Sequence, residues 1–274
     1  MKYHEVSGSH YDLGLKIGQT DAELAKFTIR QYATYHAPFP RPGPCKRLTQ
    51  ALELAGKKFP WAIEEMRGIA DGAGVPFEAV AFLQFFGFGR SRSLTTSCSN
   101  LVFTASDRGP LLVGNLDDPP IHRLVSFIPN HGCAYTFINW PGTLLTWSGM
   151  NERGLAISGS SASLLGEQSP KERPKDNLLQ NVTSYLVNRI ILKEAGTMSE
   201  TVEILRRPDI PGSGNHIAVD ASGRAVVVEK TGFKLYGIRE AENGWIACGN
   251  LFPSNIPLYD FSKDPVAVAH LSRY

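Results

Sequence analysis

Apolar residues in the first third of the chain are spaced as in helices. They recur every three or four positions among polar residues, which is the pattern of a helix that buries one face. A proline-rich run at residues 37–44 interrupts this pattern, and Gly72 stands where a glycine could end a helix. Helices are expected over residues 10–34, about 47–58, from Pro60 to about 71, and about 77–86.

At about residue 97 the pattern changes to short apolar runs separated by turn residues. Such runs are typical of strands joined by hairpins, and Asp107, Arg108 and Gly109 form the first turn. Strands are expected at residues 97–105, 110–117, 134–139, 142–149, 154–161, 215–220, 224–230, 233–238 and 245–248. Between the two groups of strands, amphipathic helices are expected over 177–195 and 198–207.

The order of these elements favours one fold class. Helices are followed by strands, two more helices and further strands, so the regular alternation that builds a doubly wound parallel sheet is missing. We predict an α+β fold with antiparallel sheets and a helical layer. A length of 274 residues allows one large domain or two small ones.

The composition argues against a nucleic-acid-binding protein and a membrane protein. The net charge is +2, from 28 basic and 26 acidic residues, which gives no general attraction to nucleic acid or to an anionic membrane. No apolar stretch is long enough to span a membrane, and the N-terminus lacks the apolar core of a signal peptide. The four cysteines are scattered, which argues against a metal site and a disulfide framework. We therefore expect a cytoplasmic protein that acts on small molecules.

Cys98 is the first candidate for chemistry, because it stands where the helical pattern gives way to strands and has small hydroxyl neighbours. A single cysteine is more often a small buried apolar residue, so both interpretations stay open. Asp117 and Asp118 follow an apolar run and form either a turn or a carboxylate site. A Cys–His pair with His131 or His216 also stays open.

Two asparagine segments are weaker candidates. Asn151 lies in a stretch between two expected strands that reads as a hairpin turn. Asn250 follows the last expected strand, where its amide either turns the chain or points at an oxyanion.

Several segments, taken together and in order, resemble the acyl-coenzyme A:6-aminopenicillanic acid acyltransferase family of cysteine N-terminal-nucleophile (Ntn) hydrolases. This family is related to choloylglycine hydrolases and penicillin V acylases. The matching segments are GSHYDLG (8–14) with Gly18, EEMRGIADGAGVP (64–76), SCS (97–99), PLLVGNLD (110–117), GMNERGLA (149–156), NHIAVD (215–220) with VVE (227–229), CGNLF (248–252) and LSRY (271–274).

The resemblance implies an inactive precursor, a zymogen, that cleaves itself between Ser97 and Cys98. Residues 1–97 would form a helical propeptide or small subunit and residues 98–274 the catalytic segment, both in one folded unit. The implied fold is an αββα sandwich of two antiparallel sheets flanked by helices. The implied substrates are small N-acylated amines or acyl thioesters, with no cofactor, and a homo-oligomer is left open.

The resemblance also assigns roles at the site. The α-amino group freed on Cys98 would act as the base for its own thiol, which would attack a linear amide. Asn250 would line an oxyanion hole, Asp117 would orient the amine, and Arg273 would favour the thiolate. Asp118 is expected to be a turn residue. Asn115, Asn151 and Ser272 lie in the matched segments as supporting candidates.

Two departures from the family pattern stand out. Many relatives carry an arginine where this chain has Gly114, and relatives continue beyond the position of Arg273, which leaves a C-terminal truncation open. These departures motivate one alternative, a binding protein that keeps the Ntn fold without catalysis. The other alternative is an unprocessed Cys–His hydrolase.

Overall fold

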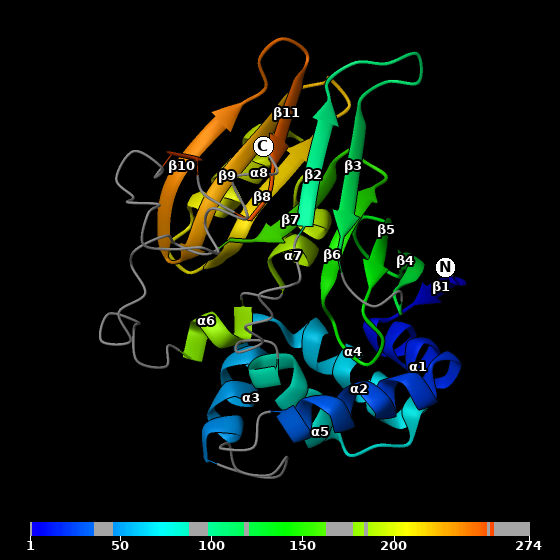
Figure 1. Cartoon of the computed structure of the whole chain (residues 1–274). Helices are drawn as coiled ribbons and strands as arrows, with labels where there is room; N and C mark the ends of the chain where they lie inside the picture. The colour runs from blue at the N-terminus through cyan, green and yellow to red at the C-terminus, as the bar shows by residue number, and fades with distance from the viewer. Residues whose placement is uncertain are drawn as a thin grey trace.

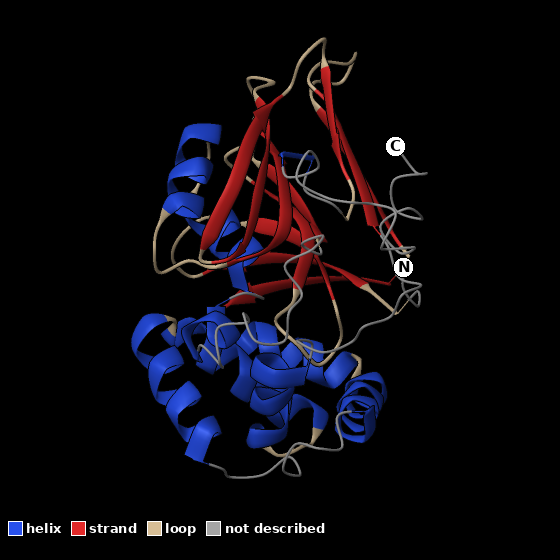
Figure 2. Ribbon diagram, turned by 60° about the vertical axis from the view of Figure 1, so that its left-hand side comes forward, coloured by secondary structure: helices blue, strands red, loops and turns tan. Residues whose placement is uncertain are grey.

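The computed structural model describes residues 2–35, 46–87, 98–117, 121–162, 178–183, 186–250 and 253–254. A group of helices from the N-terminal part of the chain lies against one end of a large sheet, and a small sheet faces that large sheet (Figure 1). Two later helices cover the other face of the large sheet (Figure 2). This arrangement confirms the predicted α+β class with two sheets.

The N-terminal helices are α1 (His10–Thr20), α2 (Ala22–Tyr35), α3 (Lys46–Lys58), α4 (Pro60–Ala73) and α5 (Phe77–Phe82), followed by a π-helical turn, η1 (Leu83–Gly87). The later helices are α6 (Leu178–Thr183), α7 (Val187–Glu194) and α8 (Met198–Arg206). The larger sheet contains β1 (Lys2–Gly8), β4 (Arg123–Pro129), β5 (Tyr135–Asn139), β6 (Thr146–Asn151), β7 (Ala156–Ser161), β8 (Gly212–Val219), β9 (Ala225–Gly232) and β10 (Lys234–Glu240). The smaller sheet contains β11 (Trp245–Cys248), β2 (Cys98–Phe103) and β3 (Leu111–Leu116), in that order.

The first predicted helix is two helices. Ser9 begins α1 with a reciprocal capping box to Asp12, and the chain leaves the helical conformation at Asp21. The carboxylate of Asp21 is buried and accepts a hydrogen bond from Arg123 of β4 at 2.8 Å. The interruption between α1 and α2 therefore places Asp21 in contact with the larger sheet. The spacing of apolar residues in the sequence does not reveal this contact.

The predicted end of the third helix near Gly72 is wrong by two residues. Helix α4 continues to Ala73 and ends at Gly74, whose φ of 66° is left-handed. Gly72 has another purpose, because a Cβ there would meet the backbone of Leu15 and would lie 2.8 Å from the nitrogen of Gln19. Gly72 lets α1 and α4 approach closely.

Strands β1 and β4 were not expected from the sequence. They pair in parallel with each other, in the register Lys2↔Arg123, so the larger sheet is antiparallel except at this pair. The two strands of this parallel pair lie more than a hundred residues apart in the chain, so a window of local sequence contains no sign of their pairing. Strand β4 also pairs antiparallel with its near neighbour β5, and this hairpin was missed by the sequence analysis. The other expected strands are present with boundaries shifted by a few residues.

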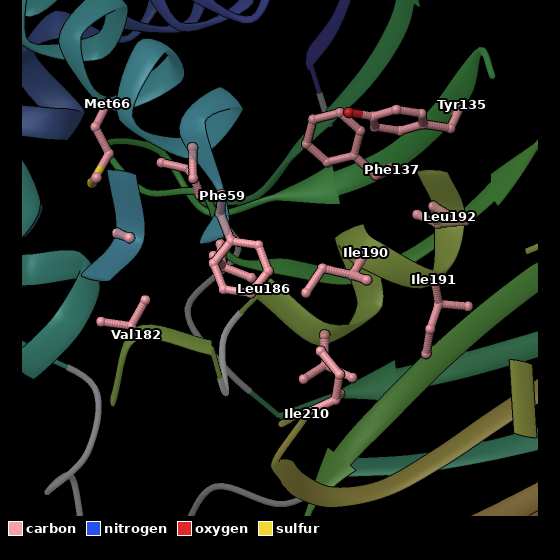
Figure 3. Close-up of a cluster of buried hydrophobic side chains, with 14 of the residues drawn as sticks. Phe59, Met66, Tyr135, Phe137, Val182, Leu186, Ile190, Ile191, Leu192 and Ile210 are labelled. Atoms are coloured by element: carbon pink, nitrogen blue, oxygen red, sulfur yellow. The ribbon is translucent and has the colours of Figure 1, made fainter. Parts of the chain in front are cut away.

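Two apolar clusters hold the layers together. The larger one lies between the helices and the larger sheet and includes Phe59, Met66, Phe137 and Ile190 (Figure 3). The smaller one fills the space between the sheets and consists of Val102, Ile217, Val219, Ala225, Val227, Ile246 and Cys248. In the part of the chain that is described, no helix lies on the outer face of the smaller sheet (Figure 2). None of the described helices has both the length and the apolar character needed to cross a membrane.

A buried ion pair joins the N-terminal helices to α7. Glu65 of α4 and Arg189 of α7 are fully buried, and Arg189 Nη1 lies 3.0 Å from both carboxylate oxygens. Burial alone would raise the pKa of Glu65, but the charge of Arg189 and the hydrogen bonds from His10 and Arg189 hold it below its usual value. The Arg189 guanidinium also lies 3.8 Å from the ring centre of Phe137.

Candidate active site

Cys98 begins β2 at the wall of a cavity of about 580 Å³ on the smaller sheet. The site thus starts at the seam where the sequence pattern changes. The described residues that line the cavity are Cys98, Ser99, Asn100, Leu101, Val113, Asn115, Asp117, Trp245, Ala247, Cys248, Gly249 and Asn250. Three of the predicted catalytic residues, Cys98, Asp117 and Asn250, are therefore brought together.

Asn250 contacts the backbone nitrogen of Cys98. Strand β11 pairs with β2 through Cys248↔Asn100, which carries the chain after β11 back to the start of β2. The Cys98 N–H donates to Asn250 Oδ1 at 2.8 Å, and Asn250 Nδ2 donates to the carbonyl of Ser161 at 2.6 Å. The side chain thus has a task that the sequence did not indicate, which is to hold the nitrogen of Cys98.

Asp117 reaches the cavity from the neighbouring strand. Strand β3 pairs with β2 through Cys98↔Leu116 and Ser99↔Asn115, so Asp117 comes directly after the residue opposite Cys98. Its Oδ1 accepts a hydrogen bond from Asn115 Nδ2 at 2.7 Å. Asn115, a supporting candidate, therefore orients the Asp117 carboxylate within the same cavity.

A polar cluster between the sheets explains why Gly114 is a glycine. A Cβ at position 114 would lie 2.8 Å from Asn100 Oδ1. Asn100 is fixed there because Ser158 Oγ donates to its Oδ1 at 2.7 Å, and Ser148 Oγ lies 2.5 Å from Ser158 Oγ. Asn100 and the two serines thus occupy the space next to position 114, and a larger side chain there requires Asn100 to move.

The described cysteines differ in environment. Burial raises the pKa of the Cys248 thiol to about 11, so it is an unreactive neighbour of the site. Burial likewise raises the pKa of Cys133, which does not line the cavity. Cys45 lies outside the described residues. Among the described cysteines, Cys98 alone begins a strand at the cavity wall.

Other candidates lie elsewhere. Asn151 does not line the cavity; its Nδ2 donates to the carbonyls of Leu192 and Ala195 and its Oδ1 accepts from Leu155, which ties the β6–β7 turn to the end of α7. His216 is buried, and its Nδ1 lies 3.0 Å from the side-chain oxygen of Asn188. Four predicted residues, Ser97, Asp118, Ser272 and Arg273, lie outside the described part of the chain.

Sequence reasoning missed the two residues that support Asn250. Ser160 Oγ and Asn215 Nδ2 both donate to the carbonyl of Gly249. Asn215 lies in a segment that carries the family resemblance, which is a usable signal, whereas Ser160 belongs to no motif.

Several solved structures resemble this chain in part. A conjugated bile acid hydrolase variant from Clostridium perfringens is 18% identical, covering 66% of this chain and 50% of its own, with a TM-score of 0.31. Penicillin V acylase from Agrobacterium tumefaciens is 17% identical, covering 56% and 44%, with a TM-score of 0.31. An N-acylethanolamine-hydrolyzing acid amidase orthologue from Caenorhabditis elegans is 15% identical, covering 64% and 86%, with a TM-score of 0.43.

The match thus spans about half the length of the bile acid hydrolase and of the penicillin V acylase. A comparison with curated proteins gives no match. The sequence comparison with protein families is more informative, because the family described as acyl-coenzyme A:6-aminopenicillanic acid acyl-transferase matches residues 105–263. This range is more than half of the chain and includes Asp117 and Asn250, while Cys98 precedes it. The resemblance read from the sequence is thereby confirmed, and the chain belongs to the acyl-coenzyme A:6-aminopenicillanic acid acyltransferase family.

Proposed function

We propose that this protein is a cysteine Ntn amidohydrolase or acyltransferase that cleaves linear amide bonds of small N-acylated amines. Residues 1–97 are its propeptide and residues 98–274 its catalytic segment. The observation that carries the proposal is the hydrogen bond from the Cys98 nitrogen to Asn250 Oδ1 in a cavity that Asp117 also lines. A nucleophile whose own nitrogen serves as base requires a fixed nitrogen, and this contact fixes it.

The proposed reaction begins with cleavage of the Ser97–Cys98 bond, which frees the α-amino group of Cys98. An α-amino group has an ordinary pKa of about 7.7–8.0, so roughly a tenth to a fifth of it is the free base at pH 7 and can accept the thiol proton. The thiolate attacks the amide carbonyl of the substrate. The protonated α-amino group then gives its proton to the substrate nitrogen, and the collapsing tetrahedral intermediate expels the amine. The thioester on Cys98 is then resolved by water or by a second amine.

The cavity supports an apolar acyl group. Leu101 and Val113 are paired on neighbouring strands, and Trp245 and Ala247 stand beside them on β11. Asn115, Asp117 and Asn250 gather at the Cys98 end of the same cavity. An apolar wall with a few convergent polar groups at one end suits an acyl chain with its amide placed at the nucleophile.

Mass spectrometry of the purified protein tests the first step. We expect a fragment that starts at Cys98, and we expect neither the fragment nor amidase activity from Cys98→Ala. Cys133→Ala is the matched control, because its thiol lies outside the cavity, and it should behave as the wild type. A Cys98→Ala protein that is still cleaved and active would exclude Cys98 as the nucleophile. Processed protein is then screened against N-acyl substrates of different acyl length.

The catalytically degenerate alternative is favoured by one observation, the polar cluster that fills the space beside Gly114. If catalysis has been lost, a thiol-reactive probe should label Cys98 no faster than a free cysteine. The Cys–His alternative has less support. None of the described residues that line the cavity is a histidine, and burial, together with the charge of Lys230, lowers the pKa of His216 to about 4.

A further inference from the structure

The carbonyl of Gly249 is fixed by two donors from the larger sheet. Ser160 of β7 and Asn215 of β8 face each other in the register of these strands, and both are buried. Ser160 Oγ donates to this carbonyl, and Asn215 Nδ2 donates to it at 2.8 Å. A carbonyl that accepts two buried hydrogen bonds has little freedom, because losing either one leaves a buried donor unpaired.

We propose that Ser160 and Asn215 are positioning residues that place Asn250 and, through it, the nitrogen of Cys98. Asn250 directly follows the fixed carbonyl, and its own Nδ2 donates to the backbone of Ser161, the neighbour of Ser160. The end of β7 therefore fixes Asn250 through two hydrogen bonds, one to the preceding carbonyl of Gly249 and one from the Asn250 Nδ2. Asn250 Oδ1 accepts the third, from the Cys98 nitrogen. The proposal rests on the proposed function, because it assigns these contacts a part in that reaction.

The same contact serves two steps. In processing, Cys98 Sγ bonds to the carbonyl carbon of Ser97, the C–N bond breaks, and the thiol proton passes to the Cys98 nitrogen. Water then attacks the resulting thioester, which returns the thiol and leaves a carboxylate on Ser97. In turnover, the freed amine donates one N–H to Asn250 Oδ1, which directs its lone pair to a fixed place. A misplacement of about 1 Å near reacting atoms costs on the order of 100-fold in rate.

Neither positioning residue is among the described residues that line the cavity, so substrate binding should not depend on them. Ser160→Ala and Asn215→Ala each remove one donor. We expect each to slow cleavage at Ser97–Cys98 and to lower kcat by about 10- to 100-fold, with KM unchanged. Ser160→Thr retains the hydroxyl and should restore most of both rates. A purely structural role would not produce this separation of kcat from KM or this rescue.

Ser199→Ala is the matched control. Its side chain is exposed on α8, contacts Arg224 and does not line the cavity, so this variant should process and turn over as the wild type does. Circular dichroism and thermal unfolding establish which variants are folded. Ser160→Ala and Asn215→Ala remove different donors to the same carbonyl. One folded variant of the two is therefore enough to test the positioning role. If both unfold, Ser160→Cys under reducing conditions takes their place, because its thiol has a similar size but is a weaker donor. Slowed processing by folded Ser160→Cys supports the positioning role, and processing at the wild-type rate contradicts it.

The results separate this inference from the proposed function. A wild type that is never cleaved and never active overturns the proposed function. A wild type that is cleaved and active, with folded Ser160→Ala and Asn215→Ala that match its rates, overturns only the positioning role. A raised KM with unchanged kcat also overturns it, because that result places the two residues in substrate binding.

Discussion

Replacing Arg189 by methionine should destabilise the protein strongly, because it leaves the Glu65 carboxylate buried without its counter-charge. Both side chains are fully buried, and Arg189 also donates to Thr146 Oγ1 at 2.7 Å. Removing one partner of a buried ion pair costs about 3–5 kcal/mol. For a domain of this size, 1 kcal/mol corresponds to a change in Tm of about 2–4 °C, so a decrease of about 6–20 °C is expected.

Thermal and urea unfolding followed by circular dichroism measures this effect. The double variant Glu65→Met/Arg189→Met should recover much of the loss, because paired apolar side chains of similar size carry no unpaired charge. Arg224→Met is the matched control, since its 2.8 Å ion pair with Glu240 is exposed on both sides and should be worth at most about 1 kcal/mol. A decrease for Arg189→Met as small as that of the control would refute the reasoning.

Three further predictions concern packing, pH and processing. Gly72→Ala should destabilise the protein by about 1–3 kcal/mol or more, because the added Cβ would collide at the α1–α4 contact. Gly56→Ala is the control and should be neutral or stabilising, because a Cβ there meets nothing within 4 Å. Equal unfolding midpoints for the two variants would contradict this prediction. The folded-state pKa of His216 is about 4, below its ordinary 6.5, so wild-type stability should fall as pH drops from about 6.5 to 4. His216→Gln should remove up to about 3 kcal/mol of that acid dependence, and parallel stability curves for the two proteins would argue against it. After cleavage at Ser97–Cys98, the fragments 1–97 and 98–274 should elute together in size-exclusion chromatography, because Glu65 and Arg189 lie on opposite fragments; separate elution without denaturant would count against the proposed unit.

The sequence predicted those parts of the fold that depend on near neighbours in the chain. Helices α3 and α8 and the hairpin of β2 and β3 lie where residue spacing, capping residues and turn residues place them. The family resemblance also selected Cys98, Asp117 and Asn250, because each lies in a short motif that can be recognised from consecutive residues. For Asn250, however, the motif did not reveal its contact with the Cys98 nitrogen, because Asn250 lies 152 positions further along the chain.

By itself, then, the sequence determined the fold class, the family, and most of the helices and strands, but not β1, β4 or the division of the first helix into α1 and α2. The tertiary structure decided what depends on pairing between distant segments: the parallel β1–β4 pair, the close approach of α1 and α4 at Gly72, the burial of Glu65 with Arg189, and the support of Asn250 by Ser160 and Asn215. The physical reason is one of range along the chain. Helix and strand propensity and turn chemistry depend on residues a few positions apart, whereas strand register, close packing and buried hydrogen bonds depend on segments that are distant in sequence and adjacent only in the folded protein.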